Sequence, residues 1–114
     1  MIPSSYRLSL KKELKVIKKK GSLIHGPYFG LLVAKLRPGP TQFGFIVSKK
    51  VSPKAVGRNR GRRLLKASVL SCLSQVESGW AVVFLAKKSL VGVKLDQVKP
   101  EVKKMLSRAG VLKS

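Results

Sequence analysis

Residues 43–66 read FGFIVSKKVSPKAVGRNRGRRLLK, and the fold prediction depends on this stretch. The stretch begins within a segment, residues 42–48, that has the pattern of a β-strand. In this segment, aromatic and branched residues alternate with small or polar ones. Ser52-Pro53 then favours a helix start, because serine is a common cap and proline suits the first helical position. The stretch therefore predicts a strand followed by a helix that runs to about Gln75.

The first turns of this helix are basic on most sides. The polar residues there are Arg58, Asn59, Arg60, Arg62, Arg63 and Lys66, whereas the apolar stripe consists of Leu65, Val69, Cys72, Leu73 and Val76. Cations at a helix N-terminus oppose the macrodipole, each by about 0.3–1 kcal/mol. Gly57 and Gly61 cost about 1 kcal/mol each relative to alanine. So many residues that disfavour a helix start, within one short segment, indicate a function. The alternative is that they form a solvated helix face.

Arginine and asparagine together suit an RNA ligand. The planar guanidinium group forms paired hydrogen bonds with phosphate, and an asparagine can bond to a base edge or a ribose. A turn with cations on most sides cannot lie wholly in a core. We therefore expect it to project past the sheet or to border a groove.

The rest of the chain predicts one α+β domain over residues 1–114. Ser9 is the expected cap of a first helix to about Lys20, with an apolar stripe of Leu10, Leu14 and Ile17. Strands are expected at 23–25, 28–36 and 80–86, with a hairpin joining 28–36 to 42–48 across the 37–40 turn. A last helix, with apolar Leu95, Val98, Val102, Met105 and Leu106, is expected to start between Asp96 and Pro100. This order predicts one sheet packed with three helices.

Charge is the strongest compositional signal. The 114 residues include 25 Lys and Arg against four Asp and Glu, for a formal net charge of +21, while 44% are hydrophobic. The hydrophobic fraction predicts a folded core, and the charge predicts a polyanionic partner. Nucleic acid is the favoured partner, with an anionic membrane surface second.

No apolar run of about 18 residues occurs, so we expect no membrane span. The single cysteine, Cys72, favours a reduced, cytoplasmic setting.

The sequence lacks the residue clusters of a nuclease active site. Its four carboxylates, Glu13, Glu77, Asp96 and Glu101, are scattered, and His25 is the only histidine. Two-metal phosphodiester chemistry requires clustered carboxylates, and acid–base chemistry by a histidine pair requires two histidines. We therefore expect no catalytic residue, no metal ligand and no bound cofactor in this chain.

The central stretch resembles the signature of the bacterial ribonuclease P protein. The matching elements are Phe43-Gly44-Phe45-Ile46-Val47-Ser48-Lys49-Lys50-Val51, Ala55-Val56, Arg58-Asn59-Arg60 and Arg63-Leu64-Leu65-Lys66, in the family's order. The resemblance implies an α+β fold with a mostly antiparallel sheet of about four strands. It also implies that the arginine-rich helix crosses between parallel strands with a left-handed connection, which is rare.

The resemblance further implies a role in tRNA maturation. The chain would be an accessory subunit that binds a catalytic RNA and the 5′ leader of precursor tRNA, with catalysis by the RNA and its Mg²⁺. DNA and membrane partners are not expected. The RNA contacts would come from Lys49, Lys50, Lys54, Arg58, Asn59, Arg60, Arg62, Arg63 and Lys66. The leader cleft would involve Leu14, Lys18, Tyr28, Gly30 and Leu32.

The chain departs from the family pattern at the cleft. The family often has aromatic residues on the first helix and in mid-strand, where bases stack, whereas this chain has Leu14, Lys18 and Leu32. Gly61 stands where a branched apolar residue is common, and Ala67 where an acidic residue is common. Leader binding would then depend more on charge than on stacking. Alternatives are a ribosomal protein, a membrane-surface protein and, least favoured, a free-standing nuclease.

The charge predicts a steep salt dependence of RNA binding. If about six phosphates are contacted, the affinity should fall about a thousandfold between roughly 50 and 200 mM salt. Filter binding over that range would measure the slope. A nearly constant affinity would contradict an electrostatic mechanism.

Overall fold

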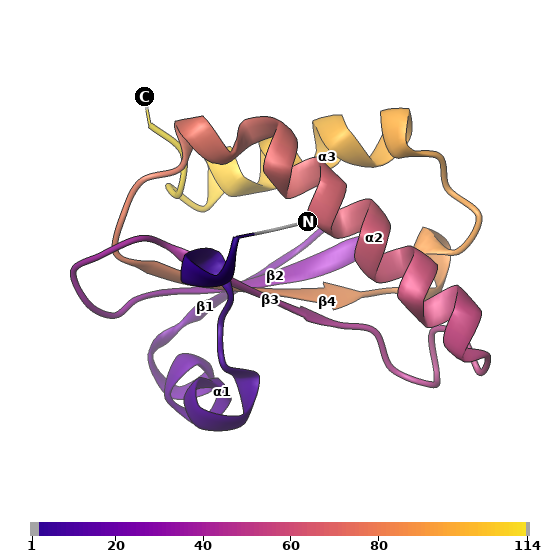
Figure 1. Cartoon of the computed structure of the whole chain (residues 1–114), viewed down its shortest axis with the longest axis horizontal. Helices are drawn as coiled ribbons and strands as arrows, with labels where there is room; N and C mark the ends of the chain where they lie inside the picture. The colour runs from indigo at the N-terminus through magenta and orange to yellow at the C-terminus, as the bar shows by residue number, and fades with distance from the viewer. Residues whose placement is uncertain (1–2, 114) are drawn as a thin grey trace.

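A four-stranded sheet forms the centre of the structure, with helices on both faces (Figure 1). The structure is a computed structural model that describes residues 3–113. The strands are β1 (Ser22–His25), β2 (Phe29–Lys35), β3 (Gln42–Ile46) and β4 (Trp80–Ala86), in the spatial order β1-β2-β4-β3. Pairs β1–β2 and β2–β4 are antiparallel, and β3–β4 is parallel. The predicted α+β class and mostly antiparallel sheet are confirmed.

The predicted hairpin between residues 28–36 and 42–48 is wrong, because β4 lies between β2 and β3. β4 is apolar along its whole length, and a strand of that kind is most stable with a neighbour on each side and both faces covered. The turn at residues 37–40 pairs with the segment before β4 instead. Gly79 N donates to Gly39 O at 2.8 Å, and Trp80 N donates to Thr41 Oγ1 at 3.0 Å.

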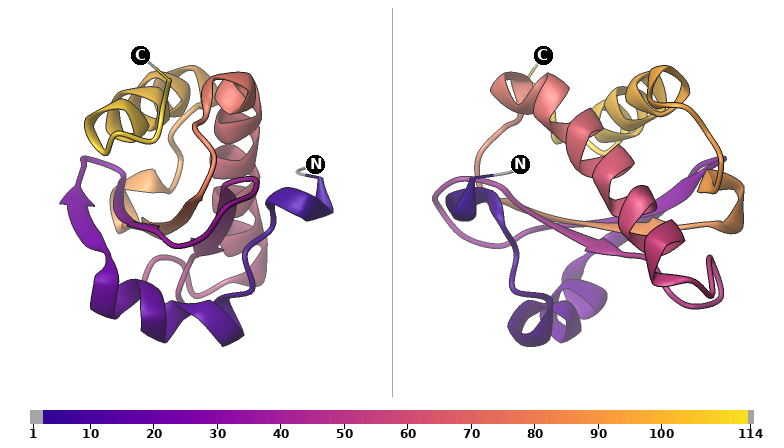
Figure 2. Two further views of the ribbon diagram at one scale, coloured as in Figure 1. Left: turned by 90° about the vertical axis from the view of Figure 1, so that its left-hand side faces the viewer. Right: turned by 45° about the vertical axis from the view of Figure 1, so that its right-hand side comes forward.

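Helix α2 (Ala55–Cys72) connects the parallel strands β3 and β4 and is extended by the short 3₁₀ helix η2 (Leu73–Gln75). Seen from the α2 side with both strands pointing upward, β4 lies to the left of β3 (Figures 1 and 2). The crossover is therefore left-handed, as the resemblance implied, against a strong general preference for the right hand.

The larger core lies between the sheet and the helices α2 and α3 (Leu95–Arg108). Phe84 is fully buried at its centre, with ring centroids of Phe29 and Phe45 each 5.2 Å away and that of Phe43 at 6.5 Å. Most of each predicted stripe is buried: Leu65, Val69 and Cys72 from α2, and Val98, Val102, Met105 and Leu106 from α3. The other predicted members are half-buried, and Leu73 and Val76 follow the end of α2, whereas Leu95 is the first residue of α3.

Helix α1 (Leu10–Lys20) covers part of the opposite face (Figure 2). Its only buried residue is Ile17, which packs in a smaller cluster with residues of β2 and β4, including Leu32 and Val83. An ion pair of 2.5 Å between Glu13 and Arg37 links α1 to the turn after β2. Before α1, the short 3₁₀ helix η1 (Ser4–Tyr6) leads into residues that lie along the β3 edge, where Leu8 N donates to Phe43 O at 2.9 Å.

Helix boundaries differ slightly from the prediction. α1 begins directly after Ser9 as expected, although the Ser9 side chain makes no capping hydrogen bond. α2 begins at Ala55 rather than at Pro53. α3 begins at Leu95, before the predicted interval, so that Pro100 lies inside the helix. A proline in the second turn removes only one backbone hydrogen bond, and the burial of the apolar stripe outweighs that loss.

The aromatic cluster around Phe84 predicts a large stability effect. Phe84→Ala should lower the free energy of unfolding by about 3–5 kcal/mol, because it removes a fully buried ring and leaves a cavity. Leu23→Ala, at a residue that is 50% exposed, should change it by less than about 1 kcal/mol. Urea denaturation would measure both, and equal losses would contradict this description of the core.

Candidate nucleic-acid interface

The first half of α2 extends beyond the sheet, as its charge pattern predicted (Figure 1). Burial on this helix begins at Gly61 and Leu65, so the preceding turns cover little of the core. Asn59, Arg60 and Arg63 are exposed, whereas Arg58, Arg62 and Lys66 are half-buried. The predicted RNA contacts of α2 therefore lie around the helix rather than on a single face.

Arg58 has a structural role that its place in the motif did not reveal. Its Nη1 atom donates to Ser52 O at 3.0 Å and to Pro53 O at 2.8 Å. These two carbonyls belong to the loop that leads into α2. Arg58 thus holds this loop against the helix and orients the start of α2.

One flank of α2 borders a basic groove of about 380 Å³. Arg62 and Lys66 line it from the helix, with Phe43, Gly44 and Phe45 from the β3 edge and Arg7, Leu8 and Leu10 from the segment before and at the start of α1. Arg62 Nη1 donates to Asn59 Oδ1 at 3.0 Å, and the Lys66 ammonium lies 5.9 Å from the Phe45 ring centroid. A groove that combines cations with an aromatic edge suits a nucleic-acid strand.

Of the residues that line this groove, sequence reasoning named only Arg62 and Lys66 as contacts. Two of the residues that it missed, Arg7 and Phe45, have side chains that suit RNA. Arg7 was not singled out, since an isolated arginine before a helix has no pattern. Phe45 was assigned to a strand and to the matching signature but not to the site, although it is half-buried and lies under Lys66. Its position on an edge strand is what leaves it accessible, and strand order is a tertiary property.

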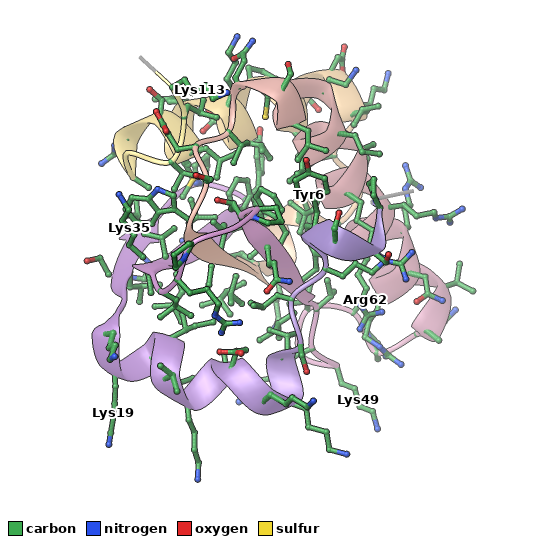
Figure 3. The ribbon with its side chains drawn as sticks, turned by 60° about the vertical axis from the view of Figure 1, so that its left-hand side comes forward. Tyr6, Lys19, Lys35, Lys49, Arg62 and Lys113 are labelled. Carbon is green, nitrogen blue, oxygen red and sulfur yellow. The ribbon has the colours of Figure 1, made fainter. Side chains whose placement is uncertain are left out.

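Arg60 and Arg63 lie on the other flank of α2. They border a shallow depression that is also lined by Leu64 and Ala67 of α2 and by Leu95. Because Leu95 is the first residue of α3, the start of α3 lies close to this flank of α2. The predicted loop lysines Lys49, Lys50 and Lys54 are all exposed between β3 and α2. Figure 3 shows Lys49 and Arg62 both pointing outward from the molecule. The cations thus face out on at least two sides of α2.

The structure does not bring all predicted cleft residues together. Leu14 and Leu32 belong to the smaller cluster between α1 and the sheet. Gly30 faces the same side of the sheet, and a Cβ added to it would lie 3.8 Å from Leu23 Cδ1. Lys18 is exposed on α1. Tyr28 instead packs against the larger core on the opposite face. It precedes the first residue of β2, Phe29, so the alternation of the strand does not apply to it.

The described residues offer no metal-binding cluster. Residues 3–113 contain no group of three His, Cys, Asp or Glu side chains able to hold a metal ion. Cys72 is buried in the larger core, and this burial raises the pKa of its thiol. A buried thiol with a raised pKa is a poor nucleophile. Within the same residues, no helix is both long and apolar enough to cross a membrane.

Comparison with known proteins gives consistent matches over nearly the whole chain. A family model described as Ribonuclease P matches residues 2–110. The "Ribonuclease P protein component" of Nitratiruptor sp. is 38% identical over 101 residues, covering 89% of each protein. The protein of that name from Clostridium kluyveri is 34% identical over 110 residues, covering 95% of this chain and 97% of the relative.

Solved structures share the fold. The RNase P protein from Thermotoga maritima has a TM-score of 0.82 at 24% identity, covering 90% of this chain and 96% of that one. The Staphylococcus aureus RNase P protein has a TM-score of 0.84 at 20% identity, covering 96% and 100%. The same arrangement of sheet and helices therefore occurs in both.

The bonds of Arg58 predict that its loss affects stability as well as binding. Arg58→Ala should lower the melting temperature by several degrees, because two loop carbonyls lose a charged donor. Arg63→Ala removes an exposed cation and should change the free energy of unfolding by no more than about 0.5 kcal/mol. Thermal unfolding by circular dichroism would measure both. An unchanged melting temperature for Arg58→Ala would show that the hydrogen bonds from Arg58 to the loop do not stabilise the fold.

Proposed function

Because the chain belongs to the ribonuclease P protein family, we propose that it binds the catalytic RNA of that enzyme through the first half of α2. As the protein subunit of an endoribonuclease that matures tRNA 5′ ends, it leaves the catalysis to the RNA. The proposed contacts are Lys49, Lys50, Lys54, Arg58, Asn59, Arg60, Arg62, Arg63 and Lys66. Residues 1–114 would act as one RNA-binding domain.

The observation that carries this proposal is the arrangement of cations around the first turns of α2. The basic groove lies on one flank, and the exposed Arg60 and Arg63 lie on the other. A structured RNA presents phosphates in several directions, so a helix with cations on more than one flank can contact two backbone segments at once. Arg58 would contribute mainly by orienting the start of the helix.

The 5′ leader of precursor tRNA is the proposed second ligand. It would lie on the α1 side of the sheet, where Lys18 is exposed and Leu14 is half-buried, whereas Gly30 and Leu32 are buried beneath that surface. Tyr28 lies on the other face and is not part of this surface. Since the proposed contacts there include no aromatic side chain, lysines of α1 would attract the leader mainly through its phosphates.

Electrostatics explain why such a ribonucleoprotein contains this subunit. Catalytic RNA and precursor tRNA are both polyanions, and a protein of net charge +21 placed between them reduces their repulsion. Mg²⁺ would bind the RNA partner and supply the catalytic metal there. The proposed setting is the cytoplasm. A ribosomal role is not favoured, because the family matches are to ribonuclease P proteins.

A cleavage assay at low Mg²⁺ tests the proposal. A bacterial ribonuclease P RNA and a precursor tRNA with a 5′ leader are incubated with and without the protein. The wild-type protein should restore correct 5′ cleavage, because it replaces charge screening otherwise supplied by Mg²⁺. A variant with alanine at Arg60, Arg62, Arg63 and Lys66 should lose at least about tenfold in affinity for the RNA.

The control is a variant with alanine at Lys99, Lys103 and Lys104, exposed cations of α3 outside the proposed contacts. It carries nearly the same loss of charge and should retain most of the stimulation. If both variants lose activity equally, net charge rather than the α2 site is responsible. If the wild-type protein binds RNA but never stimulates cleavage, the proposed role is wrong.

A further inference from the structure

A small apolar hollow lies beside the basic turns of α2, and of the contacts proposed above only Arg60 lines it. Its volume is about 230 Å³. The lining residues share an apolar or small character apart from one arginine: Val47, Val51, Val56, Gly57, Arg60, Gly61, Leu64, Leu90, Val91 and Gly92. They come from the loop after β3, from α2, and from the 3₁₀ helix η3 (Lys88–Leu90) with the residues after it.

The hollow exists because Gly61 has no side chain. Gly61 is a buried residue of α2 and does not have a positive φ angle. An added Cβ would lie 3.5 Å from Leu90 Cδ2 and 3.7 Å from Val47 Cγ1, which is ordinary van der Waals contact. A larger residue would thus fit without a clash at its first atom, and it would also favour the helix. The backbone does not require glycine here, so the open space itself needs an explanation.

The rim of the hollow is both apolar and cationic. Val56 and Val91 are 76% and 55% exposed and are two of the four large apolar residues exposed in residues 3–113. Arg60, which is also exposed, lines the same hollow. Exposed apolar groups gathered around a cavity indicate a ligand with an apolar part. The exposed Arg60 at the rim favours a ligand that also carries negative charge.

An unpaired nucleotide combines these two properties. Its phosphates can pair with the cations, and the face of its base is the apolar surface that a nucleic acid presents to such a site. The hollow is smaller than pockets for drug-sized ligands, which are about 300–1,000 Å³, so it fits a single ring system. A second copy of this chain is disfavoured as the occupant, because two molecules of +21 repel each other.

We propose that the hollow beside Gly61 receives one unpaired base of the RNA that binds α2. The base would lie against Val56, Leu64 and Val91, with the Arg60 guanidinium near its edge or its phosphate. This inference rests on the proposed function, since that function brings RNA to α2. It adds a site for a base to a surface otherwise described by phosphate contacts.

The first test uses the wild-type protein and two short probes. A single-stranded adenylate hexamer and an abasic hexamer carry the same backbone charge, but only the first has bases. In methyl NMR, the adenylate hexamer should shift the resonances of Val56, Leu64, Leu90 and Val91, and the abasic hexamer should shift them much less. Equal shifts with both probes, or no shifts with either, would overturn the proposal.

The second test fills the hollow. Gly61→Ile should raise the melting temperature and lower the affinity for a bacterial ribonuclease P RNA by about five- to tenfold, because the base can no longer bury its face against the apolar side chains of the hollow. Ser71→Ile adds the same side chain at an exposed position further along α2 and should leave the affinity unchanged. Because the expected stability and affinity changes of Gly61→Ile have opposite directions, misfolding cannot imitate the expected result.

The outcomes separate the two proposals. If wild-type protein binds the RNA and Gly61→Ile binds within twofold of it, the base site is wrong and the proposed function stands. If wild-type protein neither binds that RNA nor stimulates cleavage, the proposed function fails. The hexamer experiment then still decides whether the hollow takes a base.

Discussion

The pairing of β4 with two neighbours, β2 on one side and β3 on the other, is the constraint on which the rest of the structure depends. Since β3 and β4 are parallel, the chain must return across the sheet between them, and α2 makes that crossover. The helix must begin beyond the end of β3, where there is little sheet to cover. Its first turns therefore lie at the margin of the core, where they can carry cations without burying them.

The cost of this arrangement is electrostatic, and the core offsets it. The cations at the start of α2 oppose the helix dipole, and one buried turn holds Gly61 instead of an apolar side chain. The aromatic cluster around Phe84 and the stripes of α2 and α3 supply the stability that such a helix start lacks. The start of α2 is thus suited to binding rather than to folding, as is common at functional sites.

The sequence predicted which elements form the site better than it predicted how those elements are arranged. The strand at 80–86 and the apolar stripes of α2 and α3 were predicted correctly, because local periodicity reflects which face is buried. The hairpin was wrong, because a turn signal cannot show that another strand inserts beside it. Arg58 was predicted only as an RNA contact, yet its guanidinium holds a loop. Arg7 and Phe45 were missed, since they are brought to the groove only by strand order.

By itself, the sequence determined that this chain is a basic α+β domain with an arginine-rich helix start. These are properties of composition, period and motif, which are local along the chain. The tertiary structure alone decided which flank of α2 each cation occupies, that Tyr28 and Leu32 lie on opposite faces, and that Gly61 leaves a hollow. Those properties depend on contacts between residues far apart in sequence, and the same local pattern is compatible with several such contacts.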